Sequence, residues 1–178
     1  MAEVIRRGVM TLAALALLLL AAAAPAGAGP GNDDRAPDLG DCEELQVPDG
    51  NKVAFQAYGV GVQIYRWNGT SWVFVAPEAV LFHGDGVVAI HFAGPTWESD
   101  SGSEVVGAVI EHCTPDSDSI PWLLLEAVSS EGPGIFDRVT YIQRLNTEGG
   151  VAPAEPGDFV GEVARVPYAA DYVFYRER

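Results

Sequence analysis

The sequence predicts an all-β fold, namely a single-domain antiparallel sandwich or barrel of about 8–10 short strands. Short apolar or alternating segments recur from Leu45 onward, and clusters of glycine, proline, asparagine and aspartate separate them. The one stretch whose composition suits a helix, residues 120–128, is short and contains Pro121. We therefore expect it to form a buried strand. The sequence alone does not distinguish a sandwich from a barrel.

The first 28 residues have the order of a secretory signal peptide. Arg6 and Arg7 precede an apolar run over 9–24, and small residues follow up to Ala28. This run is about 16 residues long, whereas a membrane-spanning helix needs roughly 20. We expect cleavage after Ala26 or Ala28 and a secreted or extracytoplasmic protein without a stable membrane span.

Two regions are expected after the leader. Residues 29–44 are rich in glycine, proline and aspartate and have almost no apolar content, which predicts a flexible N-terminal arm. Residues 45–178 are expected to form the single β domain. Its strands are predicted at 52–57, 60–67, 71–76, 79–83, 87–92, 104–112, 120–128, 138–145 and 168–176. A long loop over 146–164 precedes the last of these strands.

The chain is strongly acidic, with 25 Asp and Glu against 10 Lys and Arg and a formal net charge of −15. Such a field repels nucleic acids and anionic lipid surfaces, so neither is expected as a partner. An extracellular small molecule or a glycan remains a candidate. We expect no cofactor and no metal, because no metal-ligand spacing is present and two cysteines cannot form a four-cysteine site.

The two cysteines, Cys42 and Cys113, are a disulfide candidate. In an oxidising compartment a disulfide is the natural state of such a pair, and this one would tie the N-terminal arm to the sheet. The alternative is two buried thiols.

The segment 59–76 contains the clearest hairpin, since both residues of Asn68-Gly69 tolerate the positive φ that a tight turn needs. Alternation along the two strands places one aromatic set on a shared face, namely Tyr65, Trp67, Trp72 and Phe74. It places an aliphatic set on the other face, namely Val62, Ile64, Val73 and Val75. We expect the aliphatic face to pack in the core. The aromatic face is either buried as well or forms a platform for a sugar ring or another flat ligand.

A second candidate patch lies in the segment 91–98, which contains His91, Trp97 and Glu98. If this segment and the strand that carries Arg144 converge, Glu98 could face Arg144 in a pocket. The alternatives are a structural ion pair between these two side chains, or no contact. The candidate ligand-binding residues are therefore Tyr65, Trp67, Trp72, Phe74, His91, Trp97, Glu98 and Arg144.

Catalytic motifs are missing from the sequence. It has no Gly-x-Ser-x-Gly elbow, no zinc helix motif and no phosphate loop. The favoured hypothesis is non-catalytic binding of a carbohydrate or a small apolar molecule through the aromatic face. The alternatives are an exported hydrolase that uses Glu98 with His91 or another carboxylate, and a structural cell-surface module.

Six segments carry a resemblance to a known family. They are GVQIYRW (61–67), WVFVAPEAVLF (72–82), HFAGPTWES (91–99), IPWLLLEAV (120–128), VTYIQRLNTEGG (139–150) and ARVPYAADYVFYR (164–176). In order and spacing they resemble the exported domain-of-unknown-function family 3455, found in bacteria and fungi. The resemblance runs from about Leu45 to Arg176. It implies an exported, β-rich single domain with no established activity, so no catalytic residue is carried over.

One departure from the family pattern concerns cysteines. Many members have a cysteine where Trp67 stands and another in the region of Gly157-Asp158. Both are absent here, as expected if those two cysteines pair with each other. The family's disulfide framework is therefore not carried over, and the Cys42–Cys113 pair rests on the compartment argument alone.

Overall fold

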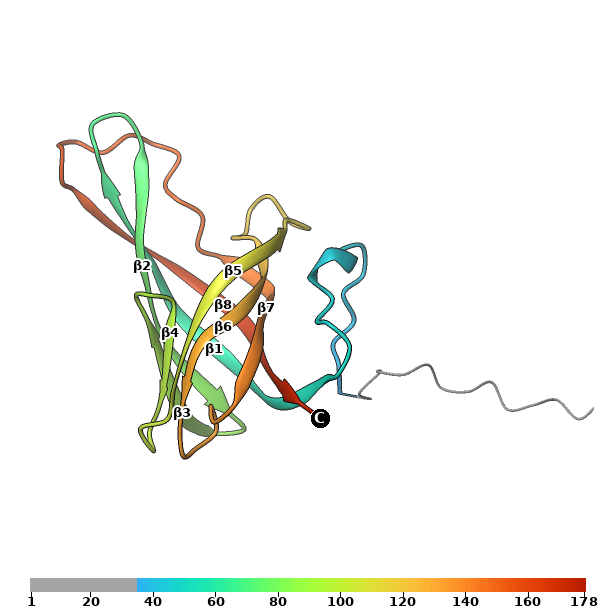
Figure 1. The fold of residues 1–178 in the computed structure, drawn as a ribbon. Helices are drawn as coiled ribbons and strands as arrows, with labels where there is room; N and C mark the ends of the chain where they lie inside the picture. Colours follow the sequence, from blue (N-terminus) through green and yellow to red (C-terminus); the bar gives the residue numbers. More distant parts are fainter. Residues whose placement is uncertain (1–34) are drawn as a thin grey trace, which may run out of the picture.

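A computed structural model describes residues 35–178 of the protein (Figure 1). The predicted leader, residues 1–28, and the start of the predicted arm, residues 29–34, lie outside the described residues. Eight strands form one closed antiparallel barrel in chain order, and β8 pairs with β1. The prediction of an all-β fold is confirmed, and the architecture is a barrel. Within the described residues, no helix is long and apolar enough to span a bilayer.

The barrel consists of strands of very unequal length. They are β1 (Asn51–Trp67), β2 (Trp72–His83), β3 (Gly86–Phe92), β4 (Thr96–Ser99), β5 (Glu104–Cys113), β6 (Trp122–Glu131), β7 (Val139–Gly149) and β8 (Val163–Glu177), after a single 3₁₀ turn η1 (Glu43–Leu45). Two of these strands, β1 and β2, each join two segments that were expected as separate strands. The sequence reading missed β4, because four residues are too few to show alternation.

The barrel interior is filled by alternate residues of each strand. Along β8, Tyr168, Ala170, Tyr172 and Phe174 point inward and are buried. Other members of the same core are Leu81, Ala89, Trp97, Val105, Leu125, Phe136 and Ile142. Large aromatic rings next to alanines fill much of this narrow barrel.

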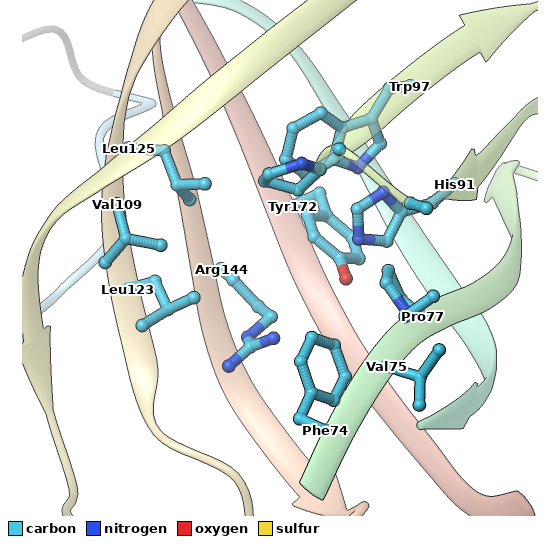
Figure 2. A pocket seen from close by; sticks show the side chains of 14 residues that line it. Phe74, Val75, Pro77, His91, Trp97, Val109, Leu123, Leu125, Arg144 and Tyr172 are labelled. Atoms are coloured by element: carbon cyan, nitrogen blue, oxygen red, sulfur yellow. The ribbon is translucent and has the colours of Figure 1, made fainter. Parts of the chain in front are cut away.

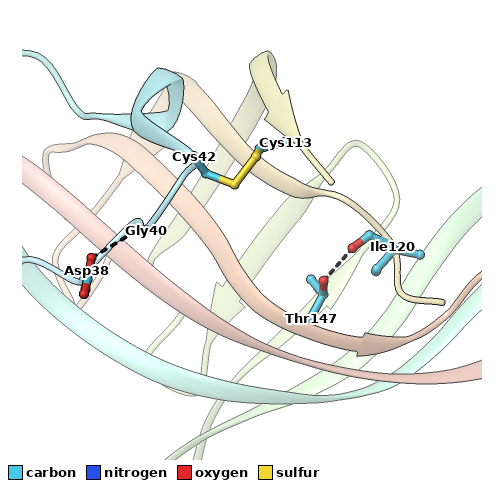
Figure 3. Close-up of a disulfide and its surroundings, with 6 residues drawn as sticks. All are labelled: Asp38, Gly40, Cys42, Cys113, Ile120 and Thr147. Carbon is cyan, nitrogen blue, oxygen red and sulfur yellow. Dashed lines mark hydrogen bonds between the residues drawn. A yellow bond between two sulfur atoms is a disulfide. The ribbon is translucent and has the colours of Figure 1, made fainter. Parts of the chain in front are cut away.

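A second core lies outside the barrel, under the N-terminal segment. Its members are Leu39, Cys42, Leu45, Val47, Val53, Leu124, Leu145, Val173 and Tyr175. The disulfide Cys42–Cys113, with Cα atoms 5.8 Å apart, joins this segment to the end of β5 (Figure 3). The predicted disulfide is thus present. Residues 35–44, which we expected to be a flexible arm, are packed on the barrel, because Leu39 and Cys42 are buried there with the disulfide.

The hairpin of β1 and β2 corrects another expectation. Trp67 pairs with Trp72, so residues 68–71 form the connection. The aliphatic face lies on the outside of the barrel, where Val73 is 47% exposed, and Val75, also 47% exposed, lies in a β-bulge at the cavity rim. Our prediction that this face packs in the core was wrong. A closed barrel puts its inward face in the core, and no second sheet of the described structure covers the outer face.

Candidate functional site

A cavity of about 200 Å³ lies inside the barrel, next to residues 74–77 of β2 (Figure 2). Val109, Leu123 and Leu125, from β5 and β6, form one wall. His91, Trp97 and Tyr172 gather on the opposite side, and Arg144 of β7 extends between the two groups (Figure 2). The cavity surface is therefore mostly carbon, with a few polar groups at defined places.

The cavity opens where the barrel wall is incomplete. Because β3 is short, β2 pairs with it only from Ala79 to His83, and β4 pairs with β5 only through residues 104–106 of β5. In the described part of the chain, residues 72–78 of β2 have no strand partner on that side. The cavity rim lies there, above the turn between β3 and β4. Two rim residues, Phe74 and Val109, are each 51% exposed, so the cavity is accessible from solvent.

His91 is a buried, neutral imidazole in this cavity. Its Nδ1 lies 2.8 Å from the carbonyl oxygen of Thr96, which can only accept a hydrogen bond. Nδ1 therefore carries the proton and Nε2 the lone pair. Desolvation by burial lowers the pKa of His91 from 6.5 to about 3. The ring stacks on Trp97 with centroids 4.3 Å apart and an angle of 6° between the planes.

Trp97 has an unsatisfied hydrogen-bond donor. Its side chain is 1% exposed, and its indole Nε1 has no partner among the described residues. An unpaired buried donor costs about 1–3 kcal/mol of stability. The side-chain nitrogen of Gln63 is also unpaired, but Gln63 does not line the cavity. Trp97 is therefore the unsatisfied group that lines this space.

Arg144 brings a positive charge into the cavity. It is partly buried, and its Nε and Nη2 donate to the carbonyl oxygen of Pro121, at 3.3 and 2.8 Å. No carboxylate of residues 35–178 lies within 4 Å of its guanidinium. Desolvation by burial lowers the pKa of Arg144 below its ordinary value, because the charge is poorly solvated.

Three tyrosines surround this charge. The hydroxyls of Tyr168 and Tyr172 are hydrogen-bonded to each other at 3.0 Å, and the hydroxyl of Tyr65 donates to the carbonyl of Gly150 at 2.7 Å. Burial raises the pKa of each of these phenols above 10. They are therefore neutral at physiological pH, and they give Arg144 polar neighbours without a counter-charge.

The family profile described as "Protein of unknown function (DUF3455)" matches residues 48–176. This chain belongs to the DUF3455 family. The match includes nearly the whole barrel and every residue that lines the cavity. No curated protein matches the chain. No solved structure matches it either.

The DUF3455 barrel keeps the four predicted platform residues on one face of the β1–β2 hairpin, with Tyr65 opposite Phe74 and Trp67 opposite Trp72, but it gives the two pairs different surroundings. Tyr65 points inward and is buried, while Phe74 lies at the cavity rim. The rings of Trp67 and Trp72 lie 5.5 Å apart, and Trp72 Nε1 donates to the carbonyl of Glu155 at 2.8 Å. The long loop between β7 and β8 therefore packs over the two tryptophans and leaves them partly exposed.

The second candidate patch of the DUF3455 chain is only partly assembled. Two of its members, His91 and Trp97, line the cavity, and so does Arg144 of β7. Glu98 is exposed on the outer face, where it pairs with Ile90, because neighbouring residues on β4 point to opposite sides. One of our interpretations placed Glu98 opposite Arg144 in a pocket. The structure shows that Glu98 does not face Arg144. It also lies on the opposite face from His91, so the Glu98–His91 pair, one version of the hydrolase hypothesis, is not formed.

Sequence reasoning missed several cavity residues of this DUF3455 chain. They are Pro77, Val109, Leu123, Leu125 and Tyr172. One usable signal was present in β8, where every second residue from Tyr168 to Phe174 is aromatic or alanine, as on the inward face of a small barrel. The wall residues of β5 and β6 gave no signal, because apolar strand residues are the same whether they fill a core or line a cavity.

Other parts of the DUF3455 surface provide weaker candidates. A hollow of about 620 Å³ lies on the outer side of the barrel between Pro37 and Tyr58, and one of about 500 Å³ lies among Lys52, Arg138 and Arg176. Over residues 35–178, no group of three or more His, Cys, Asp or Glu side chains is arranged to hold a metal ion. The inner cavity is distinct in combining apolar walls, a charge without a carboxylate partner and an unsatisfied donor.

Proposed function

We propose that this protein binds a small apolar molecule inside its barrel and catalyses no reaction on it. The observation that carries the proposal is the cavity of about 200 Å³, whose rim is exposed and whose walls are mostly carbon. An apolar cavity of roughly 150 Å³ is large enough to take up benzene. Eight-stranded barrels are of the width that holds one small ligand. A single aromatic ring with a short side chain fits this space.

The lining favours an apolar ligand over a carbohydrate. A sugar ring needs a hydrogen-bond partner for each hydroxyl that it buries. The polar side chains of the cavity are His91, Trp97, Arg144 and Tyr172, and three of them already use polar atoms on protein partners. The aliphatic wall of Val109, Leu123 and Leu125 has no group that could replace water around a sugar.

The lining also favours binding without catalysis. His91 is neutral because of its low pKa of about 3, and its Nδ1 proton is held by the Thr96 carbonyl. General acid–base chemistry works best with a group whose pKa lies near the working pH. None of the cavity residues is a carboxylate that could orient or assist this imidazole.

The compartment that we propose for this binding is outside the cytoplasm. Residues 1–28 have the pattern of a signal peptide, and the disulfide Cys42–Cys113 is typical of an oxidising environment. The ligand is accordingly an extracellular small molecule.

Calorimetric titration with a neutral ligand, 3-phenylpropan-1-ol, tests the proposal. We expect saturable binding to the wild-type protein, and at least tenfold weaker binding to Val109→Trp, because an indole at the rim would fill the entrance. Val128→Trp is the matched control, since Val128 is 63% exposed on β6 and does not line the cavity. Equal binding by the two variants, or no binding by the wild-type protein, would contradict the proposal.

A further inference from the structure

We propose that the ligand is a monocarboxylate, whose apolar part fills the cavity and whose carboxylate binds the guanidinium of Arg144. This inference rests on the proposed function and adds the chemical class of the ligand. Arg144 is the one charged residue that lines the cavity, since His91 is neutral. The local charge is therefore positive, although the whole chain carries −15.

The charge of Arg144 has no counter-ion within the described protein. Its guanidinium donates to the carbonyl oxygen of Pro121, and the adjacent Tyr172 adds a neutral hydroxyl. A partly buried charge without a partner is costly, and proteins normally pair such a group. A ligand that carries one negative charge would complete the pair.

The shape of the guanidinium selects the type of anion. Arginine has five N–H donors in a planar fork, and two parallel hydrogen bonds to the oxygens of a carboxylate match this fork. Pro121 and Tyr172 occupy only some of these donors. A phosphate monoester would bring a second negative charge among the carbon walls, which a single arginine cannot neutralise.

Trp97 supplies a second, independent observation. Its indole Nε1 can only donate, and this buried donor has no partner in the described structure. The unused donors of the cavity are this indole N–H and the N–H groups of Arg144 that Pro121 does not occupy, while the lining also carries the acceptor lone pair of His91 Nε2. A ligand end that only accepts hydrogen bonds, as a carboxylate does, suits these donors better than an ammonium group, which can only donate.

The size of the cavity limits the rest of the ligand. About 200 Å³ accommodates a phenyl ring with a chain of two or three carbons, or a linear chain of about eight carbons. The aliphatic wall contacts this part, and the aromatic rings of Phe74 and Trp97 enclose it at the rim and on the inner side. The class is thus a small aromatic or medium-chain monocarboxylate.

The test compares two ligands that differ in charge but hardly in shape, 3-phenylpropanoate and 3-phenylpropan-1-ol, by calorimetric titration at pH 7. For the wild-type protein we expect the carboxylate to bind at least tenfold more tightly than the alcohol. Arg144→Met keeps a long side chain without the charge and should abolish this preference. Arg144→Lys keeps the charge without the planar fork and should retain part of the preference.

The outcomes separate the two proposals. If the wild-type protein binds the alcohol as tightly as the carboxylate, the inference is overturned and the apolar cavity stands. If Arg144→Met keeps the full preference for the carboxylate, the inference is overturned as well. If neither ligand binds to the wild-type protein, both the inference and the proposed function are overturned. Should Arg144→Met not fold, the wild-type ligand pair and Arg144→Lys still decide the question.

Discussion

Trp67 packs directly against Gly157. A Cβ atom added to Gly157 would lie 2.7 Å from Cγ of Trp67 and 2.9 Å from its Cβ. The barrel thus brings together two positions that are 90 residues apart in the sequence. They lie in the regions in which we expect many family members to have cysteines. In this chain the indole of Trp67 packs against the backbone of Gly157 in the loop between β7 and β8.

Introducing two cysteines tests this relationship. We expect Trp67→Cys combined with Gly157→Cys to form a second disulfide on oxidation, because the two Cβ positions are only 2.9 Å apart and a small outward shift of the loop brings them to the 3.5–4.5 Å that a disulfide requires. Thiol titration and the intact mass of the double variant measure the result. Each single variant serves as a control and should retain one free thiol. A double variant that keeps two free thiols would contradict the predicted contact.

The buried state of His91 predicts a loss of stability in acid. Its pKa is about 3 in the folded protein against an ordinary value of 6.5, so below pH 6.5 the unfolded chain binds a proton that the folded chain does not. The free energy of unfolding is therefore highest above pH 6.5 and falls as the pH drops towards 3. By pH 4.5 the loss due to His91 should be roughly 2–3 kcal/mol.

The variant His91→Phe isolates this effect from the other titrating groups. It can keep the stacking on Trp97 but cannot bind a proton. Urea denaturation of both proteins at pH 7 and pH 4.5 gives the comparison. The advantage of the wild-type protein over the variant should shrink by roughly 2–3 kcal/mol between the two pH values. If the difference between the proteins stays constant, His91 is not held neutral as described.

The disulfide should contribute substantially to stability. It closes a loop of 71 residues, and in the chain-entropy model such a cross-link stabilises the folded state by about 4 kcal/mol. We expect Cys42→Ser with Cys113→Ser to lose roughly 2–4 kcal/mol in chemical denaturation. The amide protons of the packed N-terminal segment around Leu45 should also exchange faster. Unchanged stability and unchanged exchange would show that the second core holds this segment without the cross-link.

The close approach of β1 and β2 depends on Gly61. A Cβ atom at this position would lie 2.1 Å from the carbonyl oxygen of Glu78, and backbone atoms cannot move aside as a side chain can. We expect Gly61→Ala to lower the free energy of unfolding by at least about 2 kcal/mol. Gly86→Ala is the matched control, because the nearest atom there is 3.8 Å away. Similar losses in the two variants would contradict the packing described for β1.

Much of the barrel could be predicted from the sequence. Turn residues and alternation located the strands, and they predicted the aromatic side of the β1–β2 hairpin as a set that includes Tyr65 and Phe74. They did not reveal which side faces inward. Inside and outside depend on how the sheet closes on itself, which rests on the long-range pairing of β1 with β8.

The candidate site was also predicted only in part from the sequence. The sequence drew attention to His91, Trp97 and Arg144 by their chemistry, and the barrel brings these three together. It also drew attention to Glu98, the neighbour of Trp97, which the alternation of β4 turns outward. The packing of residues 35–44 was missed because Leu39 and Cys42 stand alone among polar residues, and only the outer face of the barrel completes their core.

The central claim is that a small ligand enters the barrel above the turn between β3 and β4. Intermolecular nuclear Overhauser effects between 3-phenylpropanoate and methyl-labelled protein test it most directly. We expect contacts from the phenyl ring to the methyl groups of Val109, Leu123 and Leu125. Contacts to Val60, in the hollow on the outer side of the barrel, without any to these three residues would contradict it.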